Sequence, residues 1–394
     1  MDGTASGRAG DPALLRRLNV SAALRAFLAA RTLTVSELQR AVGVSRPTAE
    51  DVLSGLLAEG QVEAVDAPVE QRRAGRPARR YRFSSADRYV VGVDVGAHSV
   101  ACAVTDLRGE VRGTARHTVD PSASAASRLS SAANLVRSTL HKAGVSADQL
   151  VGTGCGITGV VLDGGRPVDI RALPSGPGLH PYSLPGFAEL DIAARCAEAF
   201  GSTVHVGNDI KVAALAKHGH GQDAASGVRD LVYMHAGRRL GSAVMVDGQV
   251  LQGRHGLAGE IGAMRLFGWS AAMDLFEQER ARLRPPESRS DGTRELFAAA
   301  AEGDGRAADA VEAVALALAL GASALVHATD PQLVILGGGL SRVGSALAEP
   351  FRRHLEETSF HAPRVEVSTL GSESVALGAA QLASTAFRDA LITV

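Results

Sequence analysis

Hydrophobic residues at the start of the chain recur at helical spacing and predict three helices. Residues 1–13 are small and polar, and we expect them to be a disordered lead. The apolar face of the first helix comprises Leu14, Leu15, Leu18, Leu24, Phe27 and Leu28. Thr34-Val35-Ser36-Glu37 is a capping box, so a short second helix begins there. A third helix is expected from about Arg46 to Glu59, and its buried face comprises Val52, Leu53, Leu56 and Leu57.

The segment between the second and third helices has the pattern of a tight turn. Gly43 ends one helix and Ser45 caps the next, as in a helix-turn-helix. The N-terminal end of the third helix is expected to be exposed and to carry Arg46, Thr48, Ala49 and Glu50. A recognition helix meets base edges and phosphates at this end, so Ser45, Arg46 and Thr48 are candidate DNA contacts.

A basic stretch follows, between predicted strands at residues 62–65 and 81–83. Six arginines and no acidic residue fall within residues 72–82. Two strands around a basic loop form a wing, in which Arg73, Arg76 and Arg79 suit phosphates and a minor groove. The alternative is a three-helix interaction module with solvated arginines. The arginine-rich wing favours a winged helix-turn-helix at residues 14–87.

From about residue 88 the pattern changes to alternating strands and helices. Three strands at 89–96, 100–104 and from 111 precede a helix at 122–142, a strand at 150–154, a helix at 187–200 and a strand at 203–206. The second half opens in a similar way. Its expected elements are strands at 231–234 and 242–246, a hairpin turn at 247–248, helices near 271–283, 294–302 and 306–328, strands at 333–336 and 365–367, and a final helix.

This repetition predicts an internal duplication and an α/β body with two lobes and a cleft between them. Residues 88–205 with 378–394 are assigned to the first lobe. Residues 206–377 are assigned to the second lobe, which is also expected to carry an oligomerisation surface.

Composition is that of a globular protein without disulfides. The 394 residues are 45% hydrophobic and 21% charged, enough for two or three cores. The three cysteines form no C-x-x-C pair, which argues against a thiolate zinc site and fits a reducing cytoplasm. The N-terminus lacks a signal-peptide pattern, and the apolar run 313–326 is too short to span a membrane, so we interpret it as a buried helix. Residues 1–88 contain 14 arginines and 10 acidic residues. This net positive charge indicates that the N-terminal part of the chain contacts nucleic acid.

Four turns of the body carry candidate chemistry, and three of them have a plainer alternative. Asp94 and Gly96 at a strand end suit a magnesium-bound phosphate, although Asp-x-Gly turns are common in hairpins. Asn208 and Asp209 could orient a sugar hydroxyl and accept its proton, or Asp209 could be only a helix cap. Glu260, between glycines, could accept hydrogen bonds from a polyol. Residues 337–339 comprise Gly337, Gly338 and Gly339, which could pass close to a nucleotide or form only a tight turn.

At these positions the chain resembles the ROK family of repressors and sugar kinases, within the actin-like ATPase superfamily. The specific motifs are Asn208-Asp209 with Ala213-Ala214-Leu215 downstream, the segment 256–262 and the triple glycine. The resemblance implies that Asp209 matches a catalytic base, that Asn208 and Glu260 match sugar ligands, that Asp94 and Gly96 match a phosphate motif, and that the glycines border adenosine. A winged helix in front is found in the family's repressors.

The chain departs from the kinase pattern in two places. Where kinases carry a glycine-rich phosphate loop, this chain has Gly237-Arg238-Arg239-Leu240-Gly241, and arginine side chains would crowd such a loop or bind an anion. The family's zinc-binding His is Ala263 here, and residues 264–276 contain no Cys. We therefore expect no structural zinc, no cofactor, and a vestigial base at Asp209.

These features predict a cytoplasmic transcriptional regulator that binds a double-stranded DNA operator as a homodimer or homotetramer and senses a sugar or sugar derivative. One alternative is an active hexose kinase, which would rest on Asp94 and Asp209. The other is a regulator without a small ligand, whose body is a scaffold.

Overall fold

Three helices and a three-stranded sheet form the N-terminal part of the protein in the computed structural model. It describes residues 11–30, 32–65, 78–85, 87–161, 184, 186–187, 190–219, 227–237, 240–284 and 292–393. The helices are α1 (Pro12–Ala29), α2 (Val35–Val42) and α3 (Arg46–Ala58). The sheet has the antiparallel order β1-β3-β2, with β1 at Leu33–Thr34, β2 at Val62–Val65 and β3 at Arg80–Phe83. The predicted winged-helix elements are therefore present.

Side-chain caps fix the start of the second and third helices as the sequence predicts. The Thr34 hydroxyl accepts a hydrogen bond from the Glu37 amide at 3.2 Å, and Glu37 accepts one from the Thr34 amide at 2.7 Å. The hydrogen bond from the Thr34 backbone lowers the pKa of Glu37. Gly43 ends α2 with a φ of 75°, and Ser45 caps α3. These groups satisfy amides that the helices themselves leave without partners.

The core of this unit differs in part from the predicted one. Leu24 and Phe27 of α1 are buried as expected, but Leu14, Leu15 and Leu18 are 40%, 53% and 45% exposed. All buried residues of α1, Ser21, Ala23, Leu24 and Phe27, lie in its C-terminal half. The third helix also deviates from the prediction, since Leu57 is exposed and Ala49 is buried.

Ala49 lies three and four positions before Val52 and Leu53, which places all three on the inward face of α3. The predicted exposed position for Ala49 is therefore wrong.

Contacts divide the chain into two units, Met1–Arg88 with Thr385–Val394, and Tyr89–Ser384. The change at residue 88 is where the sequence pattern changes. The last ten residues belong with the N-terminal unit, whereas the sequence assigned 378–394 to the first lobe. The carbonyl of Ile392 accepts hydrogen bonds from the Ser21 hydroxyl at 2.6 Å and from Arg25 at 3.3 Å, which explains this grouping. The proposed lobe boundary at residues 205–206 stays a prediction.

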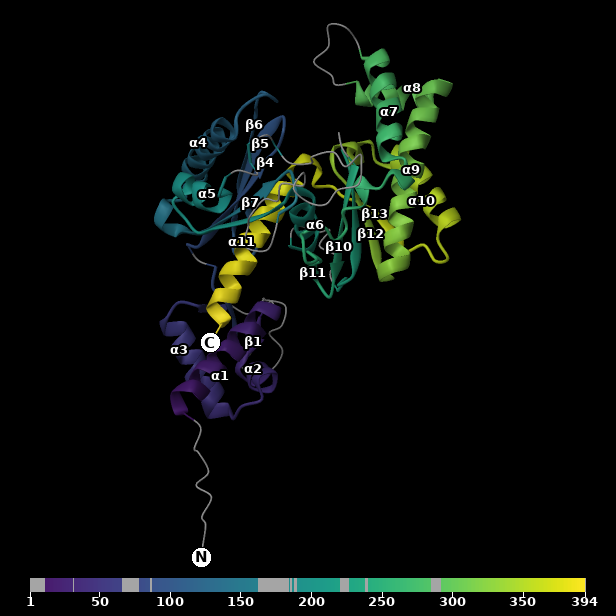
Figure 1. Cartoon of the computed structure of the whole chain (residues 1–394). Coiled ribbons are helices and arrows are strands. Elements are labelled where there is room, and N and C mark those ends of the chain that lie inside the picture. Colours follow the sequence, from purple (N-terminus) through teal and green to yellow (C-terminus); the bar gives the residue numbers. More distant parts are fainter. Residues whose placement is uncertain are drawn as a thin grey trace, which may run out of the picture. The chain divides into compact units, whose positions relative to one another are not determined.

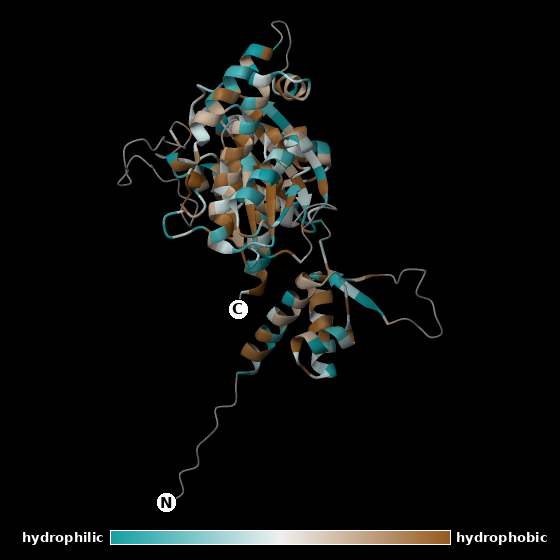
Figure 2. Ribbon diagram, turned by 90° about the vertical axis from the view of Figure 1, so that its right-hand side faces the viewer, coloured by the Kyte–Doolittle hydropathy of each residue, from teal (hydrophilic) through white to brown (hydrophobic). Residues whose placement is uncertain are grey.

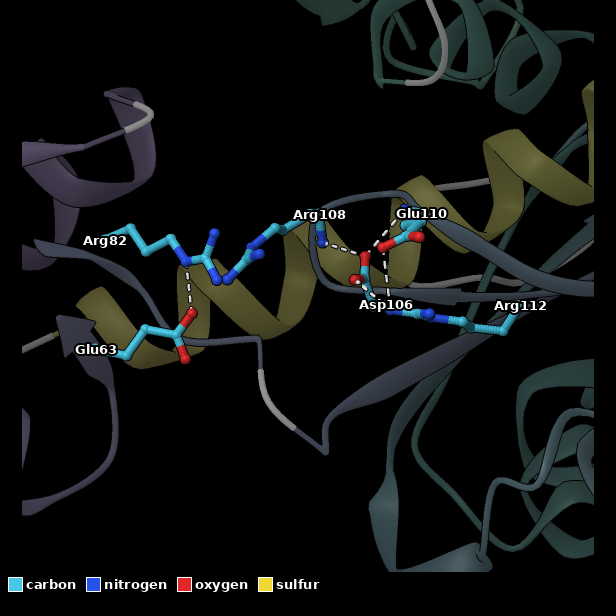
Figure 3. A network of polar contacts seen from close by, with 6 residues as sticks. All are labelled: Glu63, Arg82, Asp106, Arg108, Glu110 and Arg112. Atoms are coloured by element: carbon cyan, nitrogen blue, oxygen red, sulfur yellow. Dashed lines mark hydrogen bonds and ion pairs between the residues drawn. The ribbon is translucent and has the colours of Figure 1, made fainter. Parts of the chain in front are cut away.

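Figure 3 shows polar contacts in each unit. In the smaller unit, Arg82 of β3 pairs with Glu63, which is opposite it on β2. In the larger unit, Asp106 accepts hydrogen bonds from the backbone amides of Arg108 and Glu110 at 2.8 and 2.9 Å. Each set fixes a strand pair, the first through side chains and the second through the turn that follows β5.

The larger unit contains two sheets of the same design. The first has the order β6-β5-β4-β7-β8, formed by β4 (Tyr89–Val95), β5 (Ser99–Asp106), β6 (Val111–Thr118), β7 (Leu150–Ile157) and β8 (Val204–Asn208). The second has the order β11-β10-β9-β12-β13, formed by β9 (Leu231–Ala236), β10 (Leu240–Val246), β11 (Gln249–Val250), β12 (Leu333–Gly337) and β13 (Arg364–Val367). In both, three antiparallel strands are extended by two parallel ones. This matches the duplication expected from the sequence.

Helices cover the outer face of each sheet. The first sheet is covered by α4 (Ala125–Ala143) and α5 (Ile192–Phe200). The second sheet is flanked by α7 (Trp269–Leu283), α8 (Thr293–Ala301), α9 (Gly305–Thr329) and α10 (Ser345–Thr358). The strands at the centre of this unit are mostly hydrophobic (Figure 2). Helix α9 is long and apolar enough to cross a membrane, but 67% of its most apolar window is buried in the protein, as predicted for a core helix.

Two helices, α6 (Asp209–Gly219) and α11 (Ser374–Ile392), lie between the sheets (Figure 1). They approach their neighbours through glycines. A Cβ on Gly92 of β4 would lie 1.8 Å from the Ala376 carbonyl oxygen, and one on Gly154 of β7 would lie 1.8 Å from that of Ala379. A Cβ on Gly378 of α11 would lie 1.6 Å from the carbonyl oxygen of Val212 in α6. Backbone contact of this kind leaves no room for a side chain.

We expect Gly154→Ala to lower the free energy of unfolding by more than about 2 kcal/mol, because backbone must move to admit the methyl group. Urea denaturation measures the change. Gly305→Ala is the matched control, since a Cβ there meets nothing within 4 Å. Equal midpoints for the Gly154→Ala protein and the unchanged protein would contradict the close packing of α11 on β7.

Candidate ligand and DNA-binding sites

A small cavity of about 180 Å³ lies where strands of both sheets end. It brings together three residues that the sequence singled out, Asn208, Asp209 and Glu260. The full lining is Thr158, Gly159, Val160, Asn208, Asp209, Ile210, His235, Leu240, Gly241, Glu260 and Gly262. The volume is below the roughly 300–1,000 Å³ of cavities that hold drug-sized ligands, so it suits only a small molecule.

Asn208 and Asp209 are held firmly by neighbouring groups. The Asn208 side-chain oxygen accepts from the Lys211 amide at 2.9 Å, and its amide group donates to the Gly159 carbonyl at 2.9 Å and to Asp209 at 3.1 Å. The Thr158 hydroxyl donates to the other Asp209 oxygen at 2.8 Å. Asn208 is therefore the residue that caps α6. The Asp209 carboxylate lines the cavity and also accepts a hydrogen bond from the Ile210 amide of the first turn at 2.9 Å.

Glu260 contributes a hydrogen-bond acceptor to the cavity lining. Its Oε1 atom is buried and finds no hydrogen-bond partner among the described residues. The pKa of Glu260 is raised to about 7, mainly by burial, with the charge of Lys211 opposing this shift and the charge of Asp209 adding to it. A buried unpaired oxygen costs free energy that a ligand hydroxyl would recover, so Glu260 is the group in this cavity best placed to accept a hydrogen bond.

Lys211 is a buried cation beneath this cavity. Its ammonium group donates to the Gly256 carbonyl at 2.6 Å and lies 3.4 Å from the Gln252 carbonyl. Burial lowers its pKa, while the charge of Glu260 raises it. The lysine thus ties the segment that precedes Glu260 to α6, and it partly balances the carboxylates above it.

His235 completes the polar lining, and sequence analysis did not identify it. Its Nδ1 atom is buried without a hydrogen-bond partner in the described part of the chain, and burial lowers its pKa to about 4. A neutral imidazole can donate or accept one hydrogen bond at this nitrogen. In the sequence, His235 could have been recognised as a polar residue near the end of the otherwise apolar strand 231–236.

Asp94 faces a cation of the protein itself. Its carboxylate lies 3.8 Å from the Arg116 guanidinium, which also donates to the Ser99 hydroxyl at 2.6 Å and to the Ser372 carbonyl. The pKa of Asp94 is raised to about 7 as the net result of burial and the charge of Asp209, which raise it, and of Arg116, which lowers it. Arg116 therefore neutralises part of the charge of Asp94.

The loop after Asp94 is held by a buried arginine. Arg128 of α4 donates to the carbonyls of Gly96 and Ala97 at 2.9 and 2.8 Å, and also to Asp120 and Pro121. This loop is therefore pre-formed. No group of three or more His, Cys, Asp or Glu residues that could hold a metal ion is found among the described residues.

Packing accounts for two residues of the triple glycine. A Cβ on Gly337 would lie 2.2 Å from the Tyr233 hydroxyl, and Gly338 has a φ of 89° with the Ala236 carbonyl 2.4 Å from an ideal Cβ. Both glycines let β12 and its turn approach β9. Gly339 meets nothing within 4 Å and lines a second, larger cavity.

In the N-terminal unit, the predicted DNA contacts of α3 are accessible. Ser45 and Arg46 are exposed, and Thr48 is half-buried. Arg46 forms an ion pair with Glu50 at 2.9 Å, so it partly neutralises the acid on the same face. Arg79 is exposed beside β3, whereas Arg73, Arg76, Arg238 and Arg239 lie outside the described residues.

We expect Asp94→Asn to stabilise the protein more as pH rises. The folded state raises the pKa of Asp94 from 3.8 to about 7, so its ionisation costs stability fully above pH 7 and little below about pH 4. The variant cannot ionise there. Its advantage in melting temperature should grow from pH 4 to pH 7 and then stay constant. The exposed Asp309→Asn should show no such trend, and a pH-independent difference for Asp94→Asn would contradict the buried environment.

Comparisons with known proteins agree with this geometry. A putative xylose repressor from Caldicellulosiruptor sp. (strain Rt8B.4) is 22% identical over 94% of this chain and 96% of its own length. A glucokinase from Halalkalibacterium halodurans is 24% identical over 74% of this chain and 94% of its own length. The crystal structure of a ROK family transcriptional regulator, a homologue of the E. coli Mlc protein, has a TM-score of 0.71 at 18% identity and covers 96% of this chain and 98% of its own.

The structural likeness over nearly the whole chain confirms the expected fold, a winged helix-turn-helix followed by an actin-like, sugar-kinase-like body. The family model described as ROK family matches residues 90–386, three quarters of the sequence. This chain belongs to the ROK family.

Proposed function

We propose that the protein is a DNA-binding repressor of carbohydrate-related genes, with a body that senses a sugar or sugar derivative. The observation that carries the proposal is the combination in one chain of an exposed recognition-helix end with a small cavity that holds unpaired polar atoms. Relatives named as xylose repressors support it.

For the DNA side, α3 would enter the major groove and the wing would lie along the backbone. Ser45, Arg46 and Thr48 would contact bases and nearby phosphates. Arg73, Arg76 and Arg79 of the wing would contact phosphates and a minor groove. A homodimer or homotetramer in the cytoplasm would read two half-sites related by symmetry.

For the ligand side, a sugar would lie in the small cavity against Asn208, Asp209 and Glu260. Glu260 Oε1 would accept a hydroxyl hydrogen bond, and His235 would add a contact at Nδ1. Sugar binding would favour one of two conformations of the body, and the shift between these conformations would change the affinity of the protein for its operator.

Phosphotransfer is not part of this proposal. A kinase needs a site for the phosphates and their metal ion. Arg116 lies beside Asp94, and two arginines occupy the phosphate-loop sequence at 238–239. Asp209 would then remain from a kinase ancestor as a ligand contact. The retained Asp209, oriented by Thr158, favours an active kinase as the second candidate.

The decisive experiment is capture of fragmented genomic DNA by the purified full-length protein, followed by sequencing. A few enriched sites with inverted half-sites, beside carbohydrate genes, are expected. Diffuse recovery that disappears at moderate salt would contradict the proposal. An ATP-consumption assay with a sugar panel separates the kinase, since turnover above that of Asp209→Asn would establish an enzyme.

We expect two arginine substitutions to differ in kind. Arg76→Ala should weaken binding at many sites and reduce the slope of log affinity against log salt by about 1. Arg46→Ala should change which bases are preferred, by about 1–3 kcal/mol at the affected position. Binding titrations on matched and altered operators at several salt concentrations measure both. Unchanged affinity in both variants would exclude the winged-helix assignment as the DNA-binding part.

We also expect sugar affinity to rise with pH between about 6 and 8. The pKa of Glu260 is raised to about 7, and its ionised form accepts stronger hydrogen bonds than its neutral form. Calorimetric titration of the sugar found by the genomic experiment measures the trend. Glu260→Gln should bind more weakly and without this rise, and a rise that persists in that variant would assign it to another group.

A further inference from the structure

The exposed face of α3 is acidic, although the proposed function places this helix in the major groove. Its charged side chains are Arg46, Glu50 and Asp51, with Glu59 at the C-cap, and all of them are exposed. One cation therefore stands against three carboxylates. Carboxylates repel the phosphates of DNA, so phosphate contacts do not explain these acids. A DNA group that contacts one of them must donate a hydrogen bond, because an ionised carboxylate only accepts.

The two acids in the middle of α3 are held in different ways. Asp51 lies 4.0 Å from the guanidinium of Arg16 on α1. Glu50 instead pairs with Arg46, one turn earlier on α3, where Nε of the arginine donates to Oε1 at 2.9 Å. The side chains of Arg46 and Glu50 are 66% and 52% exposed. Among the described residues, no hydrogen bond is found for Glu50 Oε2 or for the terminal nitrogens of Arg46, so the pair still presents an acceptor and donors to a partner.

Helix stability does not account for the pair of Arg46 and Glu50. Arg46 occupies the first turn of α3, where the positive end of the helix dipole disfavours a cation. Glu50 lies beyond the first turn, where the dipole does little for an anion. An arginine four positions before a glutamate is also the less stabilising order for an ion pair on a helix. A contact outside the protein explains the pair better.

The major groove offers one base edge that fits a lone carboxylate. Amino groups there belong to cytosine N4 and adenine N6, and adenine places the acceptor N7 beside its amino group. Guanine presents the acceptors N7 and O6, and thymine presents O4 and a methyl group. Each of these acceptors would repel a carboxylate. Cytosine, which presents only a donor, is therefore the base that Glu50 can select.

We propose that Glu50 determines operator specificity by accepting a hydrogen bond, through Oε2, from the N4 amino group of a cytosine in the major groove. Arg46 holds the carboxylate through Oε1 and keeps its terminal nitrogens for the edge of a neighbouring guanine. The inference rests on the proposed function, because it needs α3 to lie in the groove. It adds the identity of one base pair in each half-site.

The test is selection of bound sequences from a randomised duplex library by the full-length protein, followed by affinity titrations on the enriched operator. The unchanged protein should enrich one C·G pair per half-site that Glu50→Ala no longer prefers. Replacing that cytosine by thymine should weaken binding about tenfold for the unchanged protein and less than about twofold for Glu50→Ala. Glu50→Gln should prefer adenine there, because an amide pairs with both N6 and N7. Thermal melting checks that each variant is folded.

Glu59→Gln is the matched control, because it removes a negative charge from an exposed acid at the other end of α3. It should keep the preference for cytosine. If it loses that preference as Glu50→Ala does, the effect is one of net charge and the proposal is overturned. A motif that is identical for the unchanged protein and Glu50→Ala overturns the role of Glu50 and leaves the regulator standing. A library from which the unchanged protein enriches nothing contradicts the proposed function as well.

Discussion

The body depends on one interface in which helix backbone meets strand backbone without side chains between them. Gly92 and Gly154 let α11 lie directly on β4 and β7, and Gly378 lets α11 approach α6. Since α6 begins at Asp209, this contact sets where the carboxylate lies relative to α11 and the first sheet. Ordinary cores tolerate exchange among hydrophobic residues of similar size, but contacts at backbone distance do not. The geometry of the small cavity is thus fixed by residues that never face it.

Around that cavity, acids outnumber bases in a region that excludes water. The charge of Asp209 raises the cost of ionising Asp94 and Glu260, while Arg116 offsets part of it at Asp94 and Lys211 offsets part of it at Glu260. Burying these carboxylates lowers the stability of the folded protein. A hydroxyl-rich ligand would reduce that cost, because its hydroxyls can donate hydrogen bonds to each carboxylate. The groups that would bind a ligand therefore reduce the stability of the fold, as is common at binding sites.

Much of the architecture could be predicted from sequence because local signals carry it. The Thr34 capping box, the Gly43 turn and the repeated strand pattern each act over a few residues. Residues whose roles depend on distant partners were missed or misjudged. Arg116 meets Asp94 only through strand pairing, Lys211 matters because of a carbonyl 45 residues away, and the exposure of Leu14 depends on which half of α1 packs against other elements. Asn208 was recognised as important, but the bond from its side-chain amide to the Gly159 carbonyl depends on a residue 49 positions away.

The end of β9 is part of both cavities. His235 lines the small one and Gly237, two residues later, lines the large one. Because this strand end forms part of the wall of each cavity, a substitution that moves the backbone at Gly237 would also move the imidazole of His235, so changes in this strand cannot alter one cavity alone.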